Sequence, residues 1–446
     1  MLSLYHSDGR AWRKWNAMAD QCQRVLTEQQ VAPAQPGTIL KDVASLIEFV
    51  GPEGIAVKSR NASLPVERLP ELNRQASYPI QLALKRALLR DYPNLAGVFI
   101  LLRVMELLQV KGNRLMVCPA AWNAWRGLNS TEQYFALLEA LLFEAQSSVI
   151  GGHRTREEAE PFETIAAFLG HLSDRWRSFD HYESAYTFGP QGLLPPWTLF
   201  VQQQLGLIEI RPRPVLAKER RDWGGRGWLV GGARLTPWGT AVTWALLEFW
   251  KEEVERVDEA EDEPEEEPDE SSRANGAEAP FGVLQRVFQP YFPEWRTVYT
   301  RPNREVRSGT HLFKVTLAGW RGGGGSIWRR LAVPPDTSLD GLAGAILKAF
   351  NLDDDHLHDF RYRDQRGKNR VYNHPYTDEG PYTPEIAVAE TDLAVKGEMR
   401  FTFDYGDYWQ FVVRLEAVEA GPCRLKQPAV LESAGTAPEQ YPEPGE

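Results

Sequence analysis

The sequence has few cysteines and no long apolar run. Its three cysteines stand at positions 22, 118 and 423, too far apart to form the paired spacing of a zinc or redox motif. No run of about 18 uncharged apolar residues is present, and the first 14 residues lack the apolar stretch of a signal peptide. We therefore expect a cytoplasmic protein with reduced cysteines and no membrane partner.

Other absences bear on the reactions that the chain could catalyse. The glycine run at 322–325 precedes a strand pattern and lacks a following Lys-Ser or Lys-Thr pair, so it does not meet the requirements of a phosphate-binding loop. The chain also has no Gly-x-Ser-x-Gly elbow and no nucleophilic serine context of the kind found in serine resolvases. We therefore expect the glycine run to be a flexible turn and do not identify the chain as a serine resolvase.

The charge of the chain is unevenly distributed. The net charge is −11, but residues 252–270 alone contain thirteen acidic residues and one arginine, a formal −12. The remaining chain is therefore close to neutral. A self-repelling segment with few apolar residues cannot offset chain entropy by burial, so we expect an acidic disordered linker over 251–280. It is either a solubilising spacer or a tether that competes for a basic surface.

Length and composition predict a multidomain protein. The 446 residues, 43% of them hydrophobic, exceed what one ordinary core accommodates. We expect a mainly α N-terminal half with two winged-helix-like units and an α+β C-terminal domain with a mainly antiparallel sheet. The expected boundaries are a helical domain with the first unit at 1–190, the second unit at 191–250, the linker at 251–280, the α+β domain at 281–419, and a flexible tail at 420–446.

The order helix, strand, turn, strand, helix occurs twice before the linker. The first instance has an apolar helix over 95–108 and a hairpin turn at 111–113. The second has a helix from 196, strands at 207–211 and 227–235, and a further helix from 237. This pattern resembles a pair of winged-helix modules. The first helix is too apolar to face nucleic acid, whereas the second offers four polar residues, Thr198, Gln202, Gln203 and Gln204.

The loop between the two strands of the second unit is rich in basic residues. Basic side chains on such a wing suit sequence-independent contacts to phosphate, although a loop that is merely solvated has the same composition. The candidate nucleic-acid-binding residues of the wing are Arg211, Arg213, Lys218, Arg220, Arg221 and Arg226.

Beyond the linker the apolar period changes to two. Residues 311–317 and 327–333 alternate as strands, an amphipathic helix follows over 338–350, and further strands are expected at 356–363, 399–403 and 409–418. This order predicts an α+β layer with helices on one side of the sheet.

Three short motifs in this half occur in fixed order. They are Ile-Trp-Arg-Arg at 327–330, His-Leu-His-Asp-Phe at 356–360, and Phe-Thr-Phe-Asp-Tyr-Gly-Asp-Tyr-Trp at 401–409. The pattern resembles the plasmid pRiA4b ORF-3-like family, often labelled passenger proteins of insertion sequences. It departs from that family at the glycine run before Ile327 and at Tyr405, where phenylalanine is usual. The resemblance implies a small α+β fold and an association with mobile elements, but no activity.

A second basic segment lies at 361–370, where five basic residues surround a glycine turn with tyrosine alongside. Nucleobases can stack on tyrosine while arginine and lysine contact phosphates; a solvated hairpin tip is the alternative. The candidate residues are Arg361, Tyr362, Arg363, Arg366, Lys368 and Arg370, and Arg329 or Arg330 could add to this surface.

Two histidines and one aspartate have the composition of a metal site. On a strand, His356 and His358 would project from the same face, and Asp404 or Asp407 would complete a two-histidine, one-carboxylate set for a divalent metal. Alternatively, Asp404 and Asp407 flank Gly406 in a turn where aspartate bonds its own backbone, and no cofactor is bound.

Two functions from different classes are consistent with these features. The first is a non-catalytic binding protein, associated with nucleic acid and mobile elements, that uses the basic wing and the basic hairpin. It predicts that charge reversal at Arg220 and Arg221, or at Arg366 and Lys368, abolishes binding. The second is a metal-dependent enzyme, of the hydrolase type, at the histidine motif; a protein-interaction adaptor is a third reading. We favour the first because positive charge occurs on several elements, whereas the metal site rests on one short motif.

Overall fold

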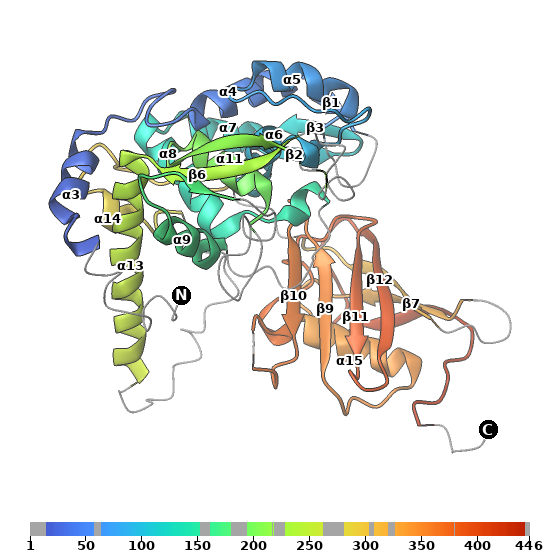
Figure 1. The fold of residues 1–446 in the computed structure, drawn as a ribbon. Helices are drawn as coiled ribbons and strands as arrows, with labels where there is room; N and C mark the ends of the chain where they lie inside the picture. Colours follow the sequence, from blue (N-terminus) through green and yellow to red (C-terminus); the bar gives the residue numbers. More distant parts are fainter. Residues whose placement is uncertain are drawn as a thin grey trace. The chain divides into compact units, whose positions relative to one another are not determined.

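In a computed structural model, the described residues form two compact units, one over 15–261 with 281–302 and one over 307–441 (Figure 1). The expected multidomain fold is confirmed, since the first unit is mainly helical and the second contains an antiparallel sheet. The structure describes residues 15–57, 64–151, 161–179, 194–215, 217, 228–261, 281–302, 307–319, 326–378 and 380–441.

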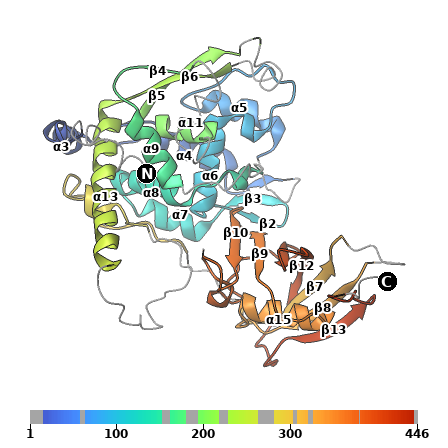
Figure 2. The ribbon, with the colours of Figure 1, turned by 60° about the horizontal axis from the view of Figure 1, so that its bottom comes forward.

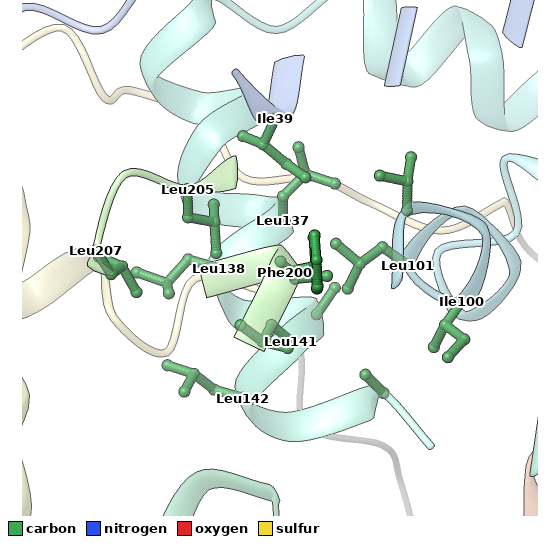
Figure 3. Close-up of a cluster of buried hydrophobic side chains, with 14 of the residues drawn as sticks. Ile39, Ile100, Leu101, Leu137, Leu138, Leu141, Leu142, Phe200, Leu205 and Leu207 are labelled. Carbon is green, nitrogen blue, oxygen red and sulfur yellow. The ribbon is translucent and has the colours of Figure 1, made fainter. Parts of the chain in front are cut away.

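The core of the first unit is built around helix α6, Pro93–Val104, every residue of which is buried. Helices α4 (Ile39–Val50), α8 (Ser130–Glu139) and α11 (Pro196–Gln204) surround it, and Figure 3 shows isoleucine, leucine and phenylalanine side chains of this cluster packed together. Helices α6 and α11 approach closely at Gly97, where a Cβ atom would lie 2.2 Å from Val201. The sequence-based prediction that α6 is buried is confirmed.

Residues 281–302 belong to the first unit, whereas the sequence placed the start of the C-terminal domain at 281. The carboxylate of Glu139 accepts hydrogen bonds of 2.7 Å from the backbone N–H groups of Gly282 and Leu284. The Trp295 ring stacks on Phe135 with centroids 4.5 Å apart. These contacts join residues about 150 positions apart, so no local pattern reveals them.

Each half of the first unit carries a small sheet followed by a helix. Strands β2 (Leu108–Lys111) and β3 (Arg114–Val117), with β1 (Ile55–Ala56), precede α7 (Pro119–Arg126). Strands β5 (Ile208–Pro214) and β6 (Trp228–Leu235), with β4 (Arg177–Ser178), precede α13 (Pro237–Glu261) (Figure 2). The order of elements is the expected one, and the winged-helix resemblance itself stays an expectation. Helix α13 extends into the segment expected to be a linker.

The remaining helices of this unit are short and lie around the core. They are α3 (Ala19–Glu28), α5 (Leu69–Gln75), α9 (Pro161–His171) and α14 (Gln285–Phe288). Helices α3 and α9 both pack against α13. Among the described residues of the whole chain, every helix is too short or too polar to cross a membrane.

The second unit is a seven-stranded antiparallel sheet in the order β10-β9-β11-β12-β7-β8-β13, with helix α15 (Leu339–Phe350) on one face (Figure 1). Alternate residues of β7 and β12 are buried in a core shared with α15, where, for example, the ring centroids of Phe350 and Phe411 lie 5.0 Å apart. This burial pattern follows the predicted period of two. The strands are β7 (His311–Leu317), β8 (Trp328–Val333), β9 (His358–Arg363), β10 (Asn369–Asn373), β11 (Glu398–Phe403), β12 (Trp409–Val418) and β13 (Ala429–Ala434).

The segment after 420, expected to be a flexible tail, packs on the sheet within the described residues. Strand β13 pairs with β8 and supplies the edge of the sheet. Further on, the Gln440 side chain accepts a hydrogen bond from the backbone N–H of Asp353 (2.6 Å), and the Tyr441 hydroxyl donates one to Asp355 (2.6 Å). Without β13, strand β8 would be an edge strand with unpaired backbone groups. Pairing with those groups holds this segment on the sheet, although its proline-rich composition predicted a tail.

Candidate nucleic-acid interface

An exposed tryptophan lies between two arginines on the β4–β6–β5 sheet. The guanidinium of Arg211 lies 5.1 Å from the centre of the Trp176 ring, and that of Arg234 lies 5.0 Å from it. Trp176 is 37% exposed. We call Trp176, Ser178, Glu209, Arg211 and Arg234 the Trp176 surface. An exposed indole flanked by two guanidinium groups can pack against a base or sugar while the arginines contact phosphate, so this surface is a candidate for binding.

The two arginines of this surface differ in their partners. Arg234 donates two hydrogen bonds to Glu209, at 3.0 and 2.7 Å, so its charge is offset by a carboxylate. The exposed Arg211 donates one of 2.6 Å to the hydroxyl of Ser178, a neutral acceptor. Within the described part of the chain, no carboxylate pairs with Arg211. Its charge is therefore available to an anion.

Two glycines of β6 make room for the arginine side chains of β5. Gly232 lies opposite Arg211 in the ladder, and a Cβ atom at this position would lie 3.0 Å from the Arg211 Nε and 2.7 Å from the Arg177 carbonyl oxygen. At Gly231 a Cβ would lie 2.8 Å from the Arg213 side chain. The Gly-Gly pair thus fixes where these guanidinium groups lie.

Of the six residues predicted on the wing, the structure describes two. Arg211 lies on the Trp176 surface as described above. Arg213 is half-buried, and its Nε donates to the carbonyl oxygen of Phe179 at 3.2 Å. The other four, Lys218, Arg220, Arg221 and Arg226, lie outside the described residues.

Three of the four polar candidates on α11 are buried and the fourth, Gln203, is half-buried, contrary to their reading as candidates for base contacts. Gln202 and Gln204 are fully buried and Thr198 is 4% exposed. Gln204 donates to Asp42 at 3.1 Å, and the side chain of Gln203 accepts from the backbone N–H of Ile210 at 3.1 Å. They form part of the interior, because α11 is enclosed by α4 and α6.

The predicted basic hairpin is not an exposed basic surface. Arg366 and Lys368 are only 6% and 5% exposed. They surround the buried carboxylate of Asp364, which accepts from the Lys368 backbone N–H at 2.9 Å and from the Arg370 Nε at 3.0 Å. Arg366 lies 3.5 Å from the same carboxylate. Asp364 thus pairs with Arg366 and Arg370, and the burial of Arg366 and Lys368 corrects the sequence-based prediction of an exposed basic hairpin.

The beginning of the same segment is divided between the two faces of the sheet. Tyr362 is 6% exposed and lies parallel to Tyr372, with ring centroids 6.2 Å apart, so it is not open to a nucleobase. Arg361 is exposed and donates two hydrogen bonds to the buried Asp359, at 3.0 and 3.3 Å. Arg363 is half-buried. Only Arg361 retains the predicted exposure.

The three candidate metal ligands do not converge. His356 precedes strand β9, is 44% exposed, and its Nε2 lies 3.5 Å from an Asp404 oxygen. His358 begins the strand, is 1% exposed, and its Nε2 lies 3.2 Å from the Thr383 hydroxyl and 3.5 Å from Asp340. Across the described ranges, no group of three histidine, cysteine or acidic side chains could hold a metal.

His358 is a buried residue of the sheet, and Asp404 is a turn residue. Burial, and then the neighbouring His374, lowers the pKa of His358 to about 4, so its imidazole is neutral near pH 7. The Asp404 carboxylate accepts from the backbone N–H groups of Gly406 (2.8 Å) and Asp407 (3.3 Å). The alternative reading of Asp404 as a turn residue is confirmed.

The sequence reasoning missed the centre of the Trp176 surface and one inward-facing arginine. The signal for the first was present, because Trp176 stands between Arg175 and Arg177. Arg329 is 8% exposed and donates to the carbonyl oxygens of Ala349 and Ala434, so it fastens the helix and the edge strand rather than extending a basic surface.

Comparison with known proteins bears on the second unit. No curated protein matches the chain. The chain is similar to a solved structure described as a protein of unknown function from Methanosarcina mazei Go1, with 24% identity over 29% of this chain and 70% of that chain, and a TM-score of 0.25. Residues 310–441 match the family model described as Plasmid pRiA4b ORF-3-like protein, which confirms for the C-terminal domain the family expected from its three motifs.

Proposed function

We propose that the protein is a non-catalytic nucleic-acid-binding protein and that the Trp176 surface contacts the phosphate backbone. One observation carries the proposal: Arg211 is exposed, has only neutral hydrogen-bond and aromatic partners within the described residues, and lies against an exposed tryptophan. An uncompensated guanidinium can donate to a phosphate. The adjoining indole adds a flat surface against which a sugar or base can pack.

The binding proposed here is independent of base sequence. Phosphate contacts position a protein on nucleic acid without reading it, and three of the four polar side chains of α11 that could have read base edges, Thr198, Gln202 and Gln204, are buried. The sequence between β5 and β6 carries four more basic residues, which lie outside the described residues and stay candidates for phosphate contacts.

Binding is favoured over metal-dependent hydrolysis by the geometry of the second unit. His358 faces Thr383 and Asp340, whereas His356 faces Asp404. A two-histidine, one-carboxylate site requires all three ligands within about 2 to 2.2 Å of one ion. The name of the matching family supports an association with plasmids or other mobile elements as part of the proposal.

The proposal is tested by measuring the affinity of the full-length protein for a fluorescently labelled DNA duplex. Arg211→Gln and Trp176→Ala should each weaken binding by about tenfold, the loss expected for one charged hydrogen bond or one stacked ring. Arg126→Gln is a matched control, because Arg126 is also exposed, lies 5.9 Å from a tryptophan ring and donates to Asn123. Equal affinity of all four proteins would contradict the proposal.

A further inference from the structure

Two arginines lie directly opposite each other on the face of the second unit that α15 does not cover. In the pairing of β9 with β11, Arg361 is the partner of Arg400. Both side chains are exposed, because their neighbours Phe360 and Phe401 take the opposite face and are fully buried in the core. Directly opposed Cβ atoms lie about 5 Å apart, and like charges in this position destabilise a sheet.

Asp359, Arg361 and Arg400 together carry one positive charge. Arg361 is held by the buried Asp359, so that pair is neutral. Glu398, two residues before Arg400 on the same strand, is engaged by Arg414 on β12. No carboxylate pairs with Arg400 within the ranges that the structure describes. The group Asp359, Arg361 and Arg400 therefore matches an anion of single charge, such as a phosphodiester.

Two exposed tyrosines from the β11–β12 turn adjoin the same group. Tyr405 is 45% exposed and Tyr408 is 59% exposed. Both lie close enough to Arg361 to raise the pKa of its guanidinium, after the larger effect of the hydrogen bond to Asp359. A ring beside a paired guanidinium is the arrangement that stacks a nucleobase in proteins that bind single strands.

Tyr408 has a strained backbone conformation. Its φ is +58°, a left-handed conformation that a bulky side chain rarely adopts. The turn holds it through the hydrogen bond from the Tyr408 backbone N–H to the Asp404 carbonyl oxygen, 2.7 Å long. Strain of this kind clusters at binding sites, where surrounding structure maintains it. An exposed ring held at this cost points to a ligand.

We propose that Arg400, Arg361 and Tyr408 bind one nucleotide unit of a single nucleic-acid strand, with the phosphodiester on the two guanidinium groups and the base against the tyrosine ring. This Arg400 site goes beyond the proposed function, since it belongs to the other compact unit and uses none of the residues of the Trp176 surface. Its ligand is a single strand, because the unpaired base is the part that the tyrosine recognises.

The test uses the full-length protein carrying Trp176→Ala and Arg211→Gln, so that the Trp176 surface is disabled in every sample. Affinity is measured for a labelled single strand of about ten nucleotides, long enough to span one such surface, and for the corresponding duplex. Arg400→Gln should weaken single-strand binding about tenfold. Tyr408→Asn should weaken it about fivefold or more. The second variant keeps the left-handed backbone, which asparagine tolerates, so it should fold at least as stably as its parent.

The matched control is Arg414→Gln, which removes an exposed arginine from the same face of the sheet but one that is already paired with Glu398. It should change affinity less than twofold, in keeping with the small contribution of an exposed, compensated charge. Equal losses for Arg400→Gln and Arg414→Gln, or no loss for either, would overturn the site.

Two further results distinguish the source of the ligand. If inorganic phosphate displaces the strand at equal charge concentration, the site recognises the anion alone and the role of Tyr408 is wrong. If the duplex binds as tightly as the single strand, the base contact is likewise wrong. Failure of the Trp176 surface would leave these outcomes unchanged, because that surface is absent from every protein compared.

Discussion

Gly232 lies directly opposite Arg211 in the β5–β6 ladder, and the arginine side chain lies against the glycine. A Cβ atom added at Gly232 would lie only 3.0 Å from the Arg211 Nε. Gly232→Ala should displace the guanidinium from Trp176. The new methyl group would also approach the Arg177 carbonyl oxygen to 2.7 Å, so we expect a loss of about 1 to 3 kcal/mol in the free energy of unfolding.

The effects of Gly232→Ala and Arg211→Gln on the affinity for duplex DNA should not be additive. If Gly232 acts by positioning Arg211, adding Arg211→Gln to Gly232→Ala should weaken binding no further than either change alone. Affinity titrations of the two single variants and the double variant measure this coupling. Independent losses that sum would show that the glycine acts on binding by another route.

The buried carboxylate of Asp364 should stabilise the second unit without contributing to binding. Asp364→Asn removes the charge that offsets Arg366 and Arg370. Removing one partner of a buried ion pair costs about 3 to 5 kcal/mol. Urea unfolding should reveal that loss, while Asp378→Asn, at an exposed position, should stay near the wild type. An increase in nucleic-acid affinity of the folded Asp364→Asn protein, through the arginine charges that the change leaves unpaired, would restore the hairpin as a binding surface.

The stability of the second unit should depend on pH through His358. The pKa of this imidazole is about 4 in the folded chain and 6.5 as its ordinary value, so the unfolded chain binds a proton first as the pH falls. Stability is then complete above pH 6.5 and decreases towards pH 4, by about 3 kcal/mol from this group. Burial also lowers the pKa of His311, which adds a loss of the same sign.

Hydrogen exchange of the β9 and β11 amides between pH 7 and pH 4 measures this decrease, once the rates are corrected for the intrinsic effect of pH. His358→Gln should flatten the dependence, since glutamine carries no titrating group. An unchanged slope in that variant would assign the acid sensitivity to other residues.

The segment after the acidic run should be necessary for the first unit. Trp295 is 1% exposed and stacks on Phe135. Trp295→Ala should therefore lower the free energy of unfolding by about 3 to 5 kcal/mol. Thermal unfolding of this variant can be compared with Leu88→Ala, at a position 38% exposed, which should cost less than about 0.5 kcal/mol. Similar melting temperatures for the two variants would place 281–302 outside the core.

Local patterns predicted the elements of this fold more reliably than their partners. The apolar helix α6, the hairpin at 111–113 and the alternation of β7 follow from composition and period. The family of the C-terminal domain followed from three short motifs. The patterns that predict single elements each span about ten residues, and the family follows from the order of three motifs alone. Neither kind of prediction requires knowledge of contacts between distant residues.

The errors arose where burial depends on distant residues. The sequence of the hairpin does not reveal that Asp364 is buried among Arg366 and Arg370, since a solvated tip would have the same composition. The partner of Trp295 is Phe135, far earlier in the chain. Strand β13 was hidden by the proline-rich residues around it, and its pairing needs the exposed edge of β8.

The salt dependence of duplex binding tests the central claim most directly. Each phosphate contact contributes about −0.9 to the slope of log affinity against log salt concentration. The account predicts a steep negative slope for the wild-type protein and a slope smaller by about one contact for Arg211→Gln. A flat dependence, or the same slope in both proteins, would contradict it.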